Sequence, residues 1–151
     1  YMEEGQVFDL GGRKLEVAWM PGHTPGSVVL LDKANGDCYS GDAFGSGEVW
    51  LQCVPMSPIA TFHESCCRME KLMKEGHIKD IWCGHYPYLK SSLPLAYIQT
   101  MIRISHRLMN GDQEGSEPYS NYFIKMTPTA RKLAEGRAMI VYDSTNIPEA
   151  R

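Results

Sequence analysis

The stretch MPGHTPGS at residues 20–27 constrains the fold more than any other part of the sequence. Two Pro-Gly steps flank His23, and proline fixes φ while glycine adopts backbone angles that other residues avoid. The stretch lies between KLEVAWM and SVVLLD, two runs whose branched and aromatic side chains favour strands. It therefore predicts a stiff turn between two strands that holds the imidazole of His23 in place.

The first half of the chain has the pattern of short strands separated by turns. The runs that we expect to form strands are QVFDL, KLEVAWM, SVVLLD and DCYSGD. Asn35-Gly36 between the last two predicts a hairpin, because both residues tolerate the positive φ of a tight turn. Residues 43–57 show no regular period and contain glycines and a proline, so we expect a loop there.

Two amphipathic helices are expected after residue 57. The first covers residues 58–75, with Ser57 as its N-cap, Pro58 at the first helical position and apolar residues at spacings of three and four. The second runs from about residue 94 to residue 109 and ends at an Asn-Gly pair.

The remaining segments complete a layered α/β fold. IKDIWCG predicts a buried strand, residues 111–121 a loop, residues 128–136 a short helix and RAMIVYD a last strand. Strands followed by alternating helices and strands predict the α/β class (α+β layered). We expect one mixed sheet with the helices on its outer face.

The composition limits the classes of protein that the chain can belong to. Its 151 residues suffice for one domain, and 43% hydrophobic with 22% charged residues is typical of a soluble globular protein. The net charge of −3 comes from interspersed acids and bases, which predicts neither a nucleic-acid surface nor a membrane-binding patch. An odd number of cysteines without a CxxC pair indicates free thiols in a reducing compartment, so we expect a cytoplasmic protein.

Three polar side chains come directly after predicted strands. His23 follows LEVAWMPG, Asp42 follows CYSG and His85 follows IKDIWCG. Residues just past strand ends gather at one edge of a sheet in layered α/β proteins, and two imidazoles with a carboxylate suit zinc. Each residue alone also fits a structural role, as a turn histidine, a turn or capping aspartate and a surface histidine. The residues by themselves leave the metal site and these structural roles as open alternatives.

PGHTPGS, SGDAF and CGHYP, in this order, resemble three of the metal-binding motifs of the metallo-β-lactamase superfamily. The flanking LGGRKLEV and the closing AMIVYD resemble strands of the same family. The resemblance implies that His23 ligates a first metal ion, that Asp42 bridges two and that His85 ligates the second. It also implies zinc as the cofactor, with one or two ions in the complete domain, and a metal-bound hydroxide that attacks an ester, thioester or similar bond.

The earlier motif of that family, HxHxDH, does not occur in this sequence. The other histidines, His63, His77 and His106, are expected on helix surfaces or at a helix end. Residues 1–151 therefore resemble a single C-terminal half-domain, one half of an αββα sandwich. We expect it to bind zinc weakly and to be inactive alone, with catalytic residues unassigned.

The missing half predicts a bare sheet face. Such a face is expected to pair with the N-terminal half of the domain, in cis or in trans, or with a second copy in a homodimer. The leading hypothesis is the C-terminal part of a zinc-dependent hydrolase of a small-molecule ester or thioester. The alternatives are a non-catalytic half-domain that binds metal or a partner, and a purely structural oligomerisation domain. Tyr86 and Tyr88 either line a substrate pocket or pack on their own loop.

Overall fold

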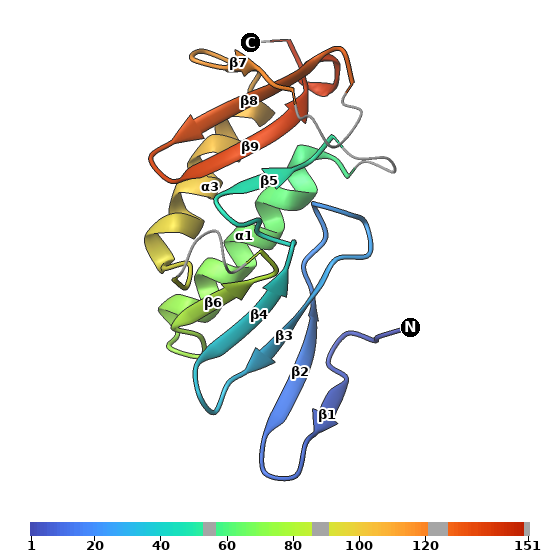
Figure 1. Cartoon of the computed structure of the whole chain (residues 1–151), viewed down its shortest axis with the longest axis vertical. Helices are drawn as coiled ribbons and strands as arrows, with labels where there is room; N and C mark the ends of the chain where they lie inside the picture. The colour runs from blue at the N-terminus through green and yellow to red at the C-terminus, as the bar shows by residue number, and fades with distance from the viewer. Residues whose placement is uncertain (53–56, 86–90, 121–126, 150–151) are drawn as a thin grey trace.

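The computed structural model describes residues 1–52, 57–85, 91–120 and 127–149, and its strands form two sheets (Figure 1). The five-stranded sheet has the order β1 (Val7–Asp9), β2 (Lys14–Trp19), β3 (Val28–Asp32), β4 (Asp37–Gly41) and β6 (Asp80–Cys83). The four-stranded sheet has the order β5 (Glu48–Trp50), β9 (Ala138–Asp143), β8 (Ala130–Glu135) and β7 (Glu117–Pro118). The helices are α1 (Ile59–Lys74), α3 (Leu95–Met109) and a 3-10 turn at Ser144–Asn146.

The expected α/β class is confirmed, but the strands divide between two mixed sheets where the sequence suggested one. Each sheet contains one parallel pair, β4 with β6 and β5 with β9. The division arises within residues 43–57, which were expected to be loop. Gly45 turns the chain there with φ +69°, and β5 then pairs with the last strand of the chain rather than with its neighbours in sequence.

Residues 128–136 do not form the short helix that their composition favours. Residues 130–135 form β8, which pairs antiparallel with β9 from Ala130 opposite Asp143 to Glu135 opposite Ala138. Gly136, with φ +57°, makes the turn between the two strands. A full ladder of hydrogen bonds to β9 outweighs the few tenths of a kcal/mol per residue of helix propensity. A two-residue strand, β7, also occurs inside the expected loop at residues 111–121.

The two long helices agree with the sequence to within a residue. Helix α1 begins at Ile59, so Pro58 rather than Ser57 is its N-cap, and no side chain caps the helix. The hydroxyl of Ser57 is buried and has no hydrogen-bond partner within the described part of the chain. Helix α3 ends at Met109 as expected, and Gly111 with φ +79° follows its cap residue, Asn110.

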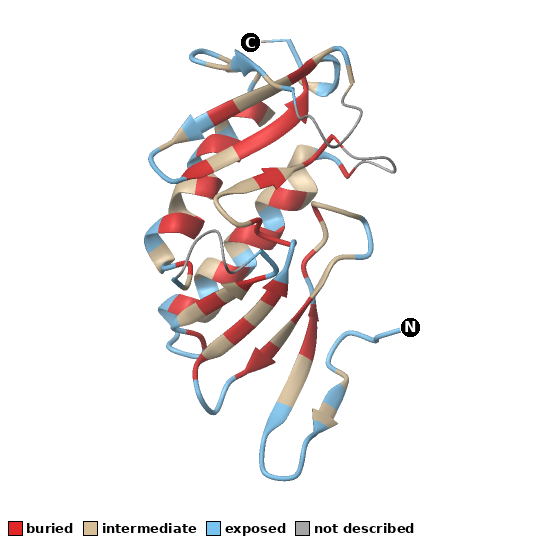
Figure 2. Ribbon diagram, viewed as in Figure 1, coloured by how far each residue is buried: buried red, intermediate tan, exposed pale blue. Residues whose placement is uncertain are grey.

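The hydrophobic core lies between the two helices and both sheets, and the four-stranded sheet contributes Val49, Leu133, Ile140 and Tyr142 to it. Alternate residues of β3, β4 and β6 point into it, and Figure 2 shows this as buried positions alternating with half-buried ones along most of these strands. The strand residues of the core include Ala18, Val29, Leu31, Cys38 and Ile81, and the helix residues include Phe62, Cys66, Met69, Met101 and Ile104. The other face of the five-stranded sheet carries half-buried Leu30 and Tyr39, fully buried Val17 and the carboxylates of Asp32 and Asp37.

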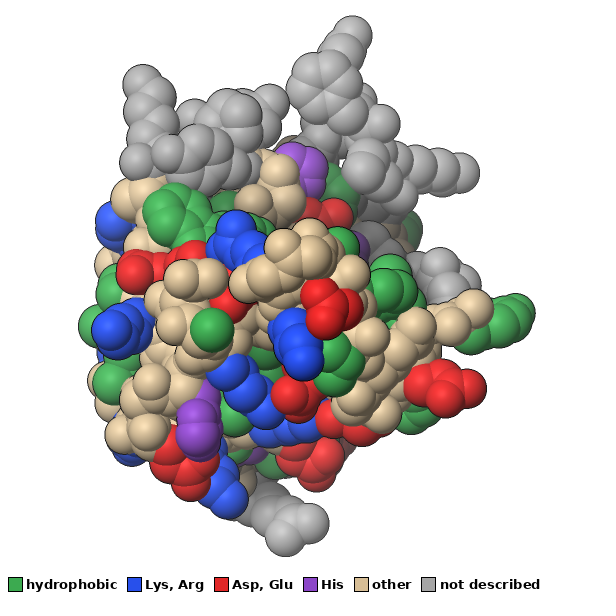
Figure 3. All heavy atoms as spheres, turned by 90° about the horizontal axis from the view of Figure 1, so that it is seen from below, with side chains coloured by type: hydrophobic (Ala, Val, Ile, Leu, Met, Phe, Trp, Pro, Cys, Tyr) green, Lys and Arg blue, Asp and Glu red, His purple; other side chains and the backbone are tan. Residues whose placement is uncertain are grey.

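Polar contacts hold the ends of the strands together. Arg13, in the turn before β2, donates to the buried carboxylate of Asp32 at the end of β3 and to the Tyr39 hydroxyl of β4 at 2.7 Å. Hydrogen bonds from Asn35 and then from Arg13 lower the pKa of Asp32. Seen from below, this end of the molecule carries intermingled acidic and basic side chains (Figure 3).

Among the described residues, no helix has both the length and the apolar character needed to cross a membrane.

The turn that contains His23 is stabilised by hydrogen bonds within the turn and by a hydrogen bond from α1. The Thr24 and Ser27 hydroxyls lie 2.9 Å apart within it, and the Met20 amide donates to the Ser27 carbonyl at 3.0 Å. From outside, the Ser65 hydroxyl of α1 donates to the Pro21 carbonyl at 2.7 Å. The glycines of the two Pro-Gly steps differ in how closely other atoms approach them. A Cβ on Gly22 would lie 2.7 Å from Cδ2 of Phe62, whereas a Cβ on Gly26 would meet no atom within 4 Å.

Gly22→Ala is expected to lower the free energy of unfolding by about 1–3 kcal/mol, because the added methyl group forces Phe62 and α1 away from the turn. Gly26→Ala is the matched control and should stay within about 0.5 kcal/mol of the wild type. Urea unfolding followed by circular dichroism measures both. Equal losses in the two variants would contradict the close approach of α1 to the first glycine.

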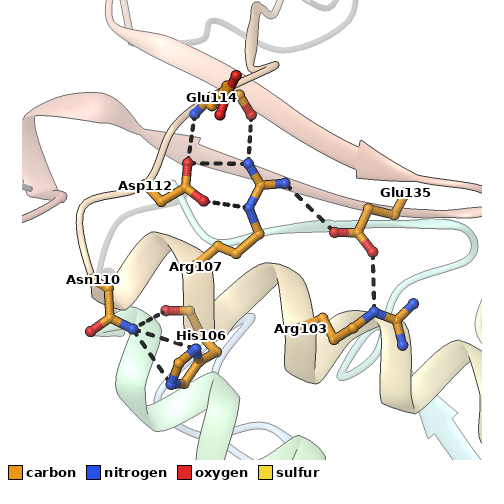
Figure 4. A network of polar contacts seen from close by, with 7 residues as sticks. All are labelled: Arg103, His106, Arg107, Asn110, Asp112, Glu114 and Glu135. Carbon is orange, nitrogen blue, oxygen red and sulfur yellow. Dashed lines mark hydrogen bonds and ion pairs between the residues drawn. The ribbon is translucent and has the colours of Figure 1, made fainter.

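An ion-pair network ties the end of α3 to the four-stranded sheet (Figure 4). Arg107 donates to both carboxylate oxygens of Asp112, at 2.7 and 3.1 Å, and lies 3.6 Å from Glu135 of β8. Glu135 also accepts from Arg103 at 3.3 Å. The hydrogen bonds from Arg107 come first among the causes that lower the pKa of Asp112 to about 2.

Asp112→Asn tests this network by its pH dependence. A carboxyl whose pKa lies at about 2 in the folded state, against an ordinary 3.8, stabilises the fold above about pH 4 and loses this effect as the pH falls towards 2. The stability difference between wild type and Asp112→Asn should therefore be constant near neutral pH and shrink between about pH 4 and pH 2. Urea midpoints at each pH measure it, with Glu114→Gln in the same loop as the control. A difference that does not change with pH would refute the prediction.

Candidate metal centre

Strand direction places the three predicted site residues at the same edge of the five-stranded sheet. Strands β2 and β4 both pair antiparallel with β3, so they run in the same direction, and β6 runs parallel to β4. His23, Asp42 and His85 each follow the carboxyl end of one of these three strands. The edge where they lie is thus set by the topology of the sheet.

Asp42 and His85 are in contact. The parallel pairing of β4 with β6 ends with Gly41 opposite Cys83, and the Gly84 amide donates to the Gly41 carbonyl at 2.8 Å. The next side chains beyond the two strands then face each other, with 3.2 Å between His85 Nε2 and Asp42 Oδ1. Both side chains remain about half exposed, at 59% and 47%, so the pair is open to an incoming molecule.

The two glycines before these residues act differently. Gly41 has φ +51°, in the left-handed region that favours glycine, and turns the chain before Asp42. Gly84 has no positive φ, and its role is to leave space, because a Cβ there would lie 2.9 Å from Asp42 Oδ1. The close approach of a carboxylate from the neighbouring strand could not be inferred before the pairing was known.

The backbone around Asp42 is fixed by groups that no sequence pattern singled out. The amide of Gly45 donates to the Asp42 carbonyl at 3.1 Å, and the Tyr97 hydroxyl of α3 donates to the Phe44 carbonyl at 2.7 Å. Phe44 is fully buried, and burial raises the pKa of the Tyr97 hydroxyl, which therefore stays protonated as a donor. Tyr97 looks like any core residue of an amphipathic helix, so no sequence signal marks it.

His23 is oriented by the second sheet. Its Nδ1 lies 2.9 Å from the Trp50 carbonyl of β5. Because a carbonyl oxygen can only accept, Nδ1 carries the proton and Nε2 holds the lone pair. Histidines that bind metals commonly donate their other ring nitrogen to a carbonyl in this way. The role of Trp50 was missed, since β5 was expected to be loop.

Cys83 also lies beside this pair, at the end of β6. Burial, with a smaller contribution from the charge of Asp42, raises the pKa of its thiol. A protonated, buried thiol is a poor nucleophile. Tyr86 and Tyr88, which the sequence suggested as pocket or loop residues, lie outside the described residues.

The donor set fits a divalent metal in part. Two ligands about 2.0–2.1 Å from a tetrahedral zinc ion lie about 3.3 Å apart, close to the 3.2 Å between His85 and Asp42. His23 lies at the same edge of the sheet, and its tautomer leaves the lone pair on Nε2. Its other ring nitrogen, Nδ1, binds the Trp50 carbonyl. Within residues 1–52, 57–85, 91–120 and 127–149, no three His, Cys, Asp or Glu side chains form a group that could hold a metal ion. The structure brings two of the predicted ligands together and leaves the metal-binding role of all three as a prediction.

A family model and a curated relative each match part of this chain. The family model described as "Metallo-beta-lactamase superfamily" matches residues 2–64. The acyl-coenzyme A thioesterase MBLAC2 of Gallus gallus is 34% identical over 85 residues, which cover 56% of this chain and 30% of that protein. The chain thus matches less than a third of the length of this relative.

Two solved structures share the fold at 18% sequence identity. A metallo-beta-lactamase family protein from Thermus thermophilus gives a TM-score of 0.55, covering 77% of this chain and 39% of that one. ETHE1 from Myxococcus xanthus gives a TM-score of 0.52, covering 71% and 51%. The resemblance to the metallo-β-lactamase superfamily is thus confirmed, in the sequence of residues 2–64 and in the fold of the chain.

Proposed function

We propose that the chain is the C-terminal part of a zinc-dependent hydrolase that cleaves small acyl thioesters. The observation that carries the proposal is the contact between Asp42 and His85 at 3.2 Å, made by two ligand-type side chains at the carboxyl ends of parallel strands. His23, at the same edge with Nε2 as its lone-pair nitrogen, is the third proposed ligand. The name of MBLAC2, an acyl-coenzyme A thioesterase, supports the choice of a thioester.

Each residue has a defined part in the proposal. Zinc, when bound, supplies a hydroxide nucleophile at neutral pH and polarises the carbonyl that it attacks. Asp42 and His85 hold the metal at the exposed edge, and His23 holds it from the stiff turn. Gly84 is a positioning residue, because only a residue without a side chain lets the Asp42 carboxylate approach His85. The buried donor Tyr97 keeps the loop after Asp42 in place.

The remaining ligands are proposed to come from the N-terminal half of the domain, on the same or on another polypeptide. The chain covers 39% and 51% of the two solved structures with the same fold, which leaves a large part of each without a counterpart here. We expect this chain alone to bind zinc weakly at the Asp42 edge and to turn over little substrate.

A non-catalytic half-domain that binds a metal or a partner is the second candidate. The observation that favours it is that the described residues contain no ready three-ligand group. The two candidates differ in whether zinc-dependent turnover depends on Asp42.

The decisive experiment measures coenzyme A release from an acyl-coenzyme A by the protein purified at its natural length, beside the 151-residue chain. Asp42→Asn and Gly84→Ala should each lower zinc-dependent kcat by about 100-fold or more, because they remove or displace a ligand. Asp9→Asn, at an exposed strand end, is the matched control and should keep its activity. Turnover that Asp42→Asn leaves unchanged would overturn the hydrolase proposal.

The open face of the five-stranded sheet is the proposed contact with the missing half. Residues opposite one another in the strand register share this face, and they lie on the side away from the buried core positions. They include Leu15, Trp19, Val28, Leu30, Tyr39 and Trp82. Val17 lies on the same face opposite Leu30 and is fully buried, whereas Trp19 is exposed and the others are half-buried. An apolar sheet face of this kind is stabilised by a second layer.

Without the other half, the 151-residue chain is expected to dimerise through this face. Trp19→Ala should weaken the dimer by about tenfold or more, as truncation of a central tryptophan does in other interfaces. Lys14→Ala on the same strand is the control, since this residue is exposed and lies on the other face. Light scattering over a range of concentrations measures the association. A monomer at high concentration would count against the open face as an interface.

A further inference from the structure

A second group of imidazole and thiol side chains lies where α1 meets α3, apart from the strand-end edge. His63 and Cys67 are one turn apart on α1, and Ser105 and His106 are neighbours on α3. The His63 and His106 rings are 6.0 Å apart between centroids, and Cys67 Sγ lies 3.6 Å from His63 Nε2. Cys67 is a free thiol and is only partly buried.

Hydrogen bonds fix the tautomer of His63. The Ser105 hydroxyl lies 2.7 Å from the Met101 carbonyl and 3.1 Å from the Ile102 carbonyl, so its proton points to the helix backbone. It therefore accepts from His63 Nδ1, 2.9 Å away. The lone pair of His63 is then on Nε2, which faces Cys67. Burial and the nearby His106 lower the pKa of His63, so the ring is neutral near pH 7.

The spacing of the thiol and the imidazole is that of two ligands on one metal ion. With Zn–S of about 2.3 Å and Zn–N of about 2.0–2.1 Å, tetrahedral geometry puts the two donor atoms about 3.6 Å apart. The observed separation is 3.6 Å. An oriented imidazole whose other nitrogen is held by a hydroxyl is the arrangement that supports a metal-binding histidine.

His106 can complete the group. Its ring is exposed, and the Asn110 amide that touches it lies 3.4 and 3.5 Å from the ring nitrogens (Figure 4). These long contacts are weak, so a turn of the His106 side chain towards His63 costs little. As the rings now lie, three such ligands do not meet at one point among the described residues.

The local charge favours a cation. Burial raises the pKa of the Cys67 thiol, and smaller contributions come from the charges of Glu70, which is paired with Lys74 at 2.7 Å, and of Glu64. The neighbouring Arg107 is paired with Asp112 and Glu135, so it does not oppose a cation with an unbalanced charge.

We propose that Cys67, His63 and His106 form a binding site for a borderline-soft divalent cation such as zinc, with water as the fourth ligand, which links α1 to α3. Binding replaces the S–H bond of Cys67 with a metal–sulfur bond and releases one proton to solvent. This site does not depend on the proposed hydrolase function.

The test uses Co²⁺ as an optical probe, in the 151-residue chain with Asp42→Asn and His85→Gln so that the strand-end edge contributes no ligands. We expect visible bands of tetrahedral cobalt together with a near-ultraviolet thiolate charge-transfer band. Cys67→Ser should abolish the charge-transfer band, and His106→Gln should raise the Kd for Co²⁺ by about tenfold or more. His77→Gln, an exposed histidine beyond α1, is the matched control and should change neither.

A second readout guards against variants that do not fold. In the chain without substitutions, zinc should slow the alkylation of Cys67 by iodoacetamide. Mass spectrometry of the peptide that contains Cys67 measures the rate of alkylation. Absence of a charge-transfer band together with unchanged alkylation would overturn the proposal. So would a band that survives in Cys67→Ser.

Discussion

The parallel pairing of β4 with β6 is the contact on which the candidate metal centre depends. The two strands are joined through α1, and their register ends with Gly41 opposite Cys83. The next side chains that project from this edge are those of Asp42 and His85, which therefore meet at 3.2 Å. Parallel strands need a long crossover connection, so two residues far apart in sequence come together only when α1 packs on the sheet.

The packing of α1 also sets the His23 turn. Phe62 fills the space left by the absent side chain of Gly22, and Ser65 one turn later binds the Pro21 carbonyl. The same helix thus supplies the crossover to β6 and the support of the turn after β2. His23 has in addition a contact with β5, through the Trp50 carbonyl, which connects the site to the second sheet. The stiffness suggested by the Pro-Gly steps comes as much from these contacts as from the turn itself.

The helices and most strands could be predicted because their signals are local. The apolar stripe of α3 and its Asn-Gly end, or the Asn35-Gly36 hairpin, depend on residues a few positions apart. The prediction for β8 was wrong because Ala130–Glu135 favours a helix in isolation, and only the ladder to β9 decides otherwise. Strand β5 was missed for a related reason. Its partner strand lies some ninety residues further along the chain, beyond the range of any local pattern.

The sequence by itself determined the edge at which the three candidate site residues lie, because a residue that follows a strand is already visible in the order of turns and apolar runs. It also determined the family resemblance, through the motifs around His23, Asp42 and His85. Only the tertiary structure decided which of these side chains touch, why Gly84 must lack a side chain, and that β5 and Tyr97 orient the site. Contacts of this kind depend on distances between strands and helices that are remote in sequence, and those distances exist only after the layers have packed.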